Sequence, residues 1–94
     1  MRSQGTLSPP VAAVASAIAR DGTGQFSIPP DKIPELGREL IAADDPKAVA
    51  TELAALSRRF ERDVGQRAQR LVQQIALLLL LISPTLNREA GPPN

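Results

Sequence analysis

The sequence predicts an all-α protein in which two short helices precede one long amphipathic helix, and three observations lead to this fold class. The nine prolines leave residues 47–83 free of proline, and Gly65 is the only glycine in that stretch. Proline breaks helix interiors but fits the first turn, so this stretch can form a long helix. Apolar residues recur within it at steps of three and four, which is the helical period. With 94 residues, the chain amounts to one small domain or less.

The composition excludes several classes of function. The net charge is +1, and the chain contains no Cys, His, Trp or Tyr. A disulfide framework, a thiolate metal site, histidine-based acid–base catalysis and an aromatic platform for nucleic-acid bases therefore all lack their residues. Ser16, Thr51 and Ser57 have no base that could activate them as nucleophiles. We predict a protein that is not an enzyme and has neither a cofactor nor a metal.

The N-terminal part, residues 8–45, is expected to hold two short helices joined by a Gly/Pro loop, after a flexible segment 1–7. In the first helix, 8–20, Ser8 occupies the N-cap position and Pro9 fits the first helical position. A signal peptide is disfavoured because two adjacent prolines stand where its apolar region should begin.

Segment 21–30 carries two glycines and two prolines, which predicts a loop. Its opening DGTG lacks the lysine and the strand–loop–helix context of a phosphate cradle, so we expect a plain turn. The second helix is predicted over 31–43, with Asp31 as its cap. Gly37 weakens that helix by roughly 1 kcal/mol relative to alanine.

The long amphipathic helix is predicted over 46–83, and residues 84–94 are expected to form a disordered tail after Ser83-Pro84. Asp45-Pro46 combines an acidic N-cap with proline at the first helical position. We therefore interpret the Asp44-Asp45 pair as part of a helix start and not as a cation-binding site. We call the apolar face of this helix the stripe. It consists of Val49, Leu53, Leu56, Phe60, Val64, Ala68, Leu71, Ile75, Leu78 and Ile82.

A straight helix of this length spans about 55 Å at ~1.5 Å per residue, which is more than the rest of the chain can cover. Its C-terminal half is rich in leucine, so a second copy, another protein or lipid should cover it. We expect an oligomeric helical bundle or a coiled-coil-like assembly, unless Gly65 breaks the helix. The predicted partner-binding residues are Val49, Leu53, Leu56, Phe60, Val64, Leu71, Ile75, Leu78 and Ile82.

The polar side of the predicted helix carries a basic face. It consists of Arg58, Arg59, Arg62, Arg67 and Arg70. Glu61 and Asp63 interrupt it, and Asp63 is placed to pair with Arg67 at i,i+4. This pattern is typical of a solvated helix face, but it also fits a membrane boundary or phosphate contacts. The apolar run 75–82 is too short for a membrane span, which needs about 20 residues.

Residues 28–82 resemble the cytoplasmic helical domain of type II secretion protein F and of related pilus-assembly platform proteins. Phe26-Ser27-Ile28-Pro29-Pro30 is similar to the Phe-Pro-Pro start of that domain, and Phe60-Glu61-Arg62-Asp63-Val64 is similar to its aromatic-acid stretch. The turn at 44–47 lacks the family's glycines, Ala76-Leu77 replaces its Glu-Pro, and a full membrane span is absent. The resemblance implies a non-enzymatic inner-membrane platform fragment that contacts an assembly ATPase.

Three functions are therefore expected, in decreasing order of preference. The first is a non-enzymatic helical interaction or assembly module, either a homo-oligomer or one bound to a helical protein. The second is a membrane-peripheral fragment of a secretion or pilus platform. The third is a small dimeric nucleic-acid-associated regulator. The first two place the chain in the cytoplasm or at the inner membrane.

Overall fold

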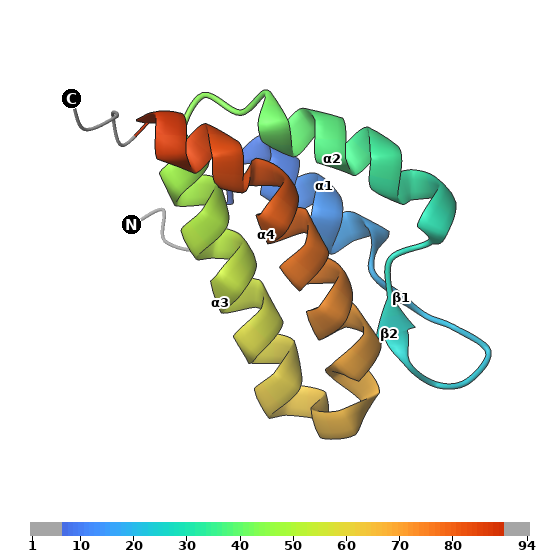
Figure 1. The fold of residues 1–94 in the computed structure, drawn as a ribbon. Helices are drawn as coiled ribbons and strands as arrows, with labels where there is room; N and C mark the ends of the chain where they lie inside the picture. Colours follow the sequence, from blue (N-terminus) through green and yellow to red (C-terminus); the bar gives the residue numbers. More distant parts are fainter. Residues whose placement is uncertain (1–6, 90–94) are drawn as a thin grey trace.

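Helices make up most of the computed structural model, which describes residues 7–89, and the predicted all-α class is confirmed. Figure 1 shows α3 and α4 running side by side, with α1 and α2 packed across them. The α-helices are α1 (Pro9–Ala17), α2 (Ile33–Ile41), α3 (Pro46–Val64) and α4 (Gln69–Glu89). The shorter elements are strands β1 (Ala19–Arg20) and β2 (Phe26–Ser27) and the 3₁₀-helices η1 (Pro30–Lys32) and η2 (Gly65–Ala68).

The first helix begins where the prolines predict but ends three residues early. Ser8 makes no side-chain cap; its backbone N–H and hydroxyl donate instead to the Glu52 carboxylate of α3, at 2.8 and 3.2 Å. The helix stops at Ala17 because Ile18 is extended and leads into β1. A long-range hydrogen bond has therefore replaced the predicted local cap.

The predicted loop 21–30 is in part a small β-hairpin, which is a correction. Strands β1 and β2 pair antiparallel, with Ala19 opposite Ser27 and Arg20 opposite Phe26. The glycines and prolines leave room for this short pairing because they lie outside the two-residue strands. The turn predicted for DGTG is confirmed, since the Asp21 carboxylate accepts hydrogen bonds within it from the residues that follow.

The second helix begins later than predicted, and Asp31 does not cap it. Pro30–Lys32 form η1, and α2 then begins at Ile33 without a side-chain cap. The 3₁₀-helix η1 begins at Pro30, and Pro34 lies in the first turn of α2. Proline fixes a backbone angle that suits a first helical turn, which explains why two helical elements begin in succession here.

The predicted helix from Pro46 is present, because every residue from Pro46 to Glu89 is helical, but it is not straight. Asp45 caps it as predicted, accepting from the Ala48 N–H at 3.2 Å. At Gly65 the backbone takes φ 60° and ψ −125°, and the chain reverses so that α4 returns beside α3. The expectation of one projecting helix is therefore wrong.

Two further expectations about this segment are corrected. The helix does not end at Ser83-Pro84, because α4 continues through Pro84 to Glu89. Its C-terminal part changes direction in Figure 1, as expected where proline removes a backbone hydrogen bond inside a helix. Residues 1–6 of the predicted flexible N-terminus and 90–94 of the predicted tail lie outside the described residues.

The reversal lets the chain bury its own stripe. The core draws on every α-helix and on the residue after β2, and the stripe supplies most of it. The largest fully buried side chains of the core are Val11, Val14, Ile28, Leu40, Val49, Leu53, Leu71, Ile75, Leu78 and Ile82. No other molecule is therefore needed to cover the stripe, because the two short helices cover a folded hairpin and not a straight helix of about 55 Å.

Candidate functional site

The predicted partner-binding residues lie in the core. Six of them, Val49, Leu53, Leu71, Ile75, Leu78 and Ile82, are at most 1% exposed. The other three, Leu56, Phe60 and Val64, are half-buried, and the Phe60 ring packs against Phe26 with 5.5 Å between centroids. In this fold the six cannot contact a partner, so their predicted role is corrected to that of core residues.

A different apolar face is exposed on α4. Leu77, Leu80 and Leu81 are 60%, 68% and 48% exposed, and Ile41 at the end of α2 is 45% exposed. We call these four residues the leucine surface. With the exposed Pro84, the α4 members are spaced i, i+3, i+4 and i+7, which places them on one side of the helix.

The leucine surface extends from α4 to α2. Leu81 lies over Gly37 of α2, where an added Cβ would come within 3.2 Å of the Leu81 Cδ1 atom. Ile41 follows Gly37 by one helical turn, so it lies on the same side of α2. The close approach at Gly37 thus brings apolar residues from two helices together.

Polar contacts fix the rotation of α4 about its axis. The Gln74 side-chain amide forms two hydrogen bonds with the backbone of Ile28, accepting from its N–H at 2.7 Å and donating to its carbonyl at 2.9 Å. One turn earlier, Arg70 pairs with Asp21 at 2.9 Å. These contacts attach α4 to the hairpin segment. The buried residues Ile75 and Ile82 turn the opposite side of α4 to the core, which leaves Leu77 and Leu80 outside.

Asp21 organises the turn that carries these contacts. Its carboxylate accepts from the Thr23 hydroxyl, from the Thr23 N–H at 2.8 Å and from the Gln25 N–H at 3.2 Å. The Thr23 hydroxyl contributes most to lowering the pKa of Asp21 below its ordinary value of 3.8, and the two N–H groups and Arg70 add to this against the opposing effect of burial. The carboxylate is therefore held in its charged form.

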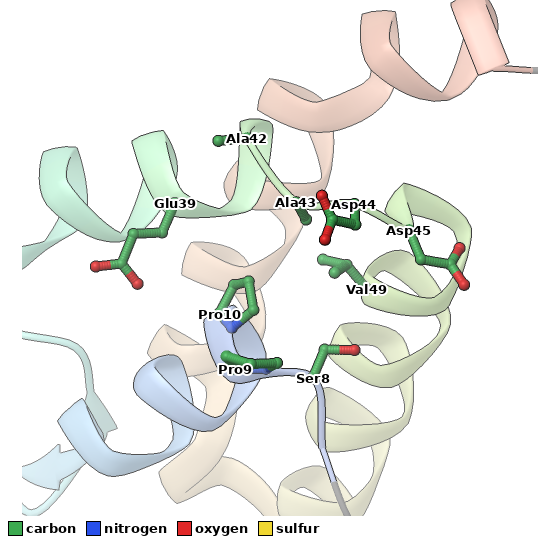
Figure 2. A pocket seen from close by; sticks show the side chains of 9 residues that line it. All are labelled: Ser8, Pro9, Pro10, Glu39, Ala42, Ala43, Asp44, Asp45 and Val49. Atoms are coloured by element: carbon green, nitrogen blue, oxygen red, sulfur yellow. The ribbon is translucent and has the colours of Figure 1, made fainter.

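A pocket of about 430 Å³ lies where α1 begins and the α2–α3 connection passes. Pro9, Pro10 and Val49 line it together with the acidic residues Glu39 and Asp45, whose carboxylates lie on opposite sides in Figure 2. The Asp45 carboxylate is engaged as the α3 cap, and within residues 7–89 no group of three or more His, Cys, Asp or Glu could hold a metal.

The predicted basic face is divided by the reversal. All five arginines are exposed: Arg58, Arg59 and Arg62 on α3, Arg67 in η2 and Arg70 on α4. The Asp63 Oδ1 atom lies 3.9 Å from the Arg62 Nε atom, and the predicted ion pair of Asp63 with Arg67 is not among those of residues 7–89, since the helix is interrupted at Gly65 between them. The arginines therefore do not form one continuous row.

The helical run Pro46–Leu86 contains a window of 18 residues that is long and apolar enough to cross a membrane, with a mean hydropathy of 1.3 and 22% of the window buried. Core helices of soluble proteins satisfy the same criterion. The window alone therefore does not decide between a protein partner and lipid.

Comparison with known protein families, with curated proteins and with solved structures found no significant match to this chain. The resemblance to secretion and pilus platform proteins stays a prediction. The leucine surface is therefore the candidate functional site of this chain.

Proposed function

We propose that the protein is a non-enzymatic helical interaction or assembly module that docks a helical partner through the leucine surface. The observation that carries this proposal is the exposure of Leu77, Leu80 and Leu81 on one side of α4. Fully burying one such side chain contributes roughly 1.5–3 kcal/mol, so a cluster of them favours association. None of these three leucines belongs to the hydrophobic core cluster or packs against it.

The spacing of the exposed residues supports a helical partner. Positions i, i+3, i+4 and i+7 form the ridge that packs into the groove of a neighbouring helix. Residues 71–87 carry no charged side chain, so a partner helix meets no buried charge along this side of α4.

A membrane-peripheral role is the second candidate, and the apolar window of the α4 region favours it. In that role the leucine surface enters the lipid interface on the cytoplasmic side of the inner membrane, in keeping with the resemblance to platform proteins. A nucleic-acid-associated role has less support, because the arginines are divided and the net charge is only +1.

Site-specific photo-cross-linking in cells that express the protein tests this proposal. A photoreactive amino acid replaces Leu80 in one variant and the exposed Ala55 of α3 in the control. We expect protein adducts from position 80 and few from position 55. Adducts with lipid alone at position 80 would support the second candidate and contradict the first. Equal adduct yields at the two positions would also contradict the proposal.

A further inference from the structure

We draw no further inference here: the strongest candidate, the identity of the molecule that covers the leucine surface on the outer side of α4 and the end of α2, belongs to the site already described, and nothing in the structure shows what covers that apolar face.

Discussion

Asp21 shows how one side chain serves both its own turn and a distant helix. Its carboxylate closes the turn through Thr23 and Gln25 and reaches Arg70 on α4, 49 residues later. The turn was predictable because Asp-Gly is a local signal. The contact with Arg70 was not, because it depends on the reversal of the chain.

The lowered pKa of Asp21 leads to a prediction of pH dependence. A carboxyl group whose pKa is lower in the folded state adds stability above its ordinary value of 3.8, and this contribution is lost as the pH falls through the lowered pKa. Asp21→Asn should therefore destabilise the fold near neutral pH, and the difference from wild type should shrink below about pH 3.8.

Urea unfolding at a series of pH values measures this effect. Asp31→Asn, which removes an exposed carboxylate from η1, is the matched control. A constant difference between wild type and Asp21→Asn from neutral pH to below pH 3.8 would contradict the assigned cause.

The residue scale also separates predictable contacts from unpredictable ones. The Asp45 cap was predictable because it joins residues three positions apart. The contacts of Ser8 with Glu52 and of Gln74 with Ile28 join residues 44 and 46 positions apart. No local pattern distinguishes Gln74 from the other glutamines, so its contact with Ile28 could not be predicted from the sequence.

At the scale of elements, Gly65 decides how the longest helical segment is used. Apolar periodicity predicted helix across this position, and the residues on both sides are helical. Periodicity carries no information about direction, because a glycine inside a helix and a glycine at a reversal look alike in sequence. The positive φ at Gly65 is the feature that converts one long helix into a hairpin.

Substitution of Gly65 tests this role. A residue with a Cβ is strained at φ 60° and ψ −125°, even though there is open space around the position. Gly65→Ala should therefore lower the free energy of unfolding by about 1–2 kcal/mol. Chemical denaturation measures the loss, and Gln66→Ala in η2 is the control. An unchanged or increased stability would contradict the importance of this backbone conformation.

At the scale of the whole molecule, the apolar residues of α4 divide into a buried set that belongs to the core and an exposed set that forms the leucine surface. The all-α class and the identity of most core residues were predictable from helical periodicity. The candidate site was predictable only in part. The leucine-rich C-terminal half was expected to need a cover, but the residues named for the contact were those of the stripe. The reversal places Ile75 inside and leaves Leu80 outside.

Alanine substitutions distinguish the two sets of apolar residues. Ile75→Ala should lower the free energy of unfolding by about 2–5 kcal/mol, because it leaves a cavity in the core. Leu80→Ala should change it by less than about 1 kcal/mol when measured on monomer at low concentration. Similar losses at both positions would contradict the assignment of Ile75 to the core and Leu80 to the surface.

The hairpin turn at Gly65 has one more consequence, which concerns exchange between molecules. If the backbone straightened at this residue, α4 of one chain could occupy the place of α4 in another, and the stripe would be buried in a domain-swapped pair. Such a pair uses the core residues and leaves Leu80 in solvent. The conformation of a single glycine thus separates self-contained folding from arm exchange.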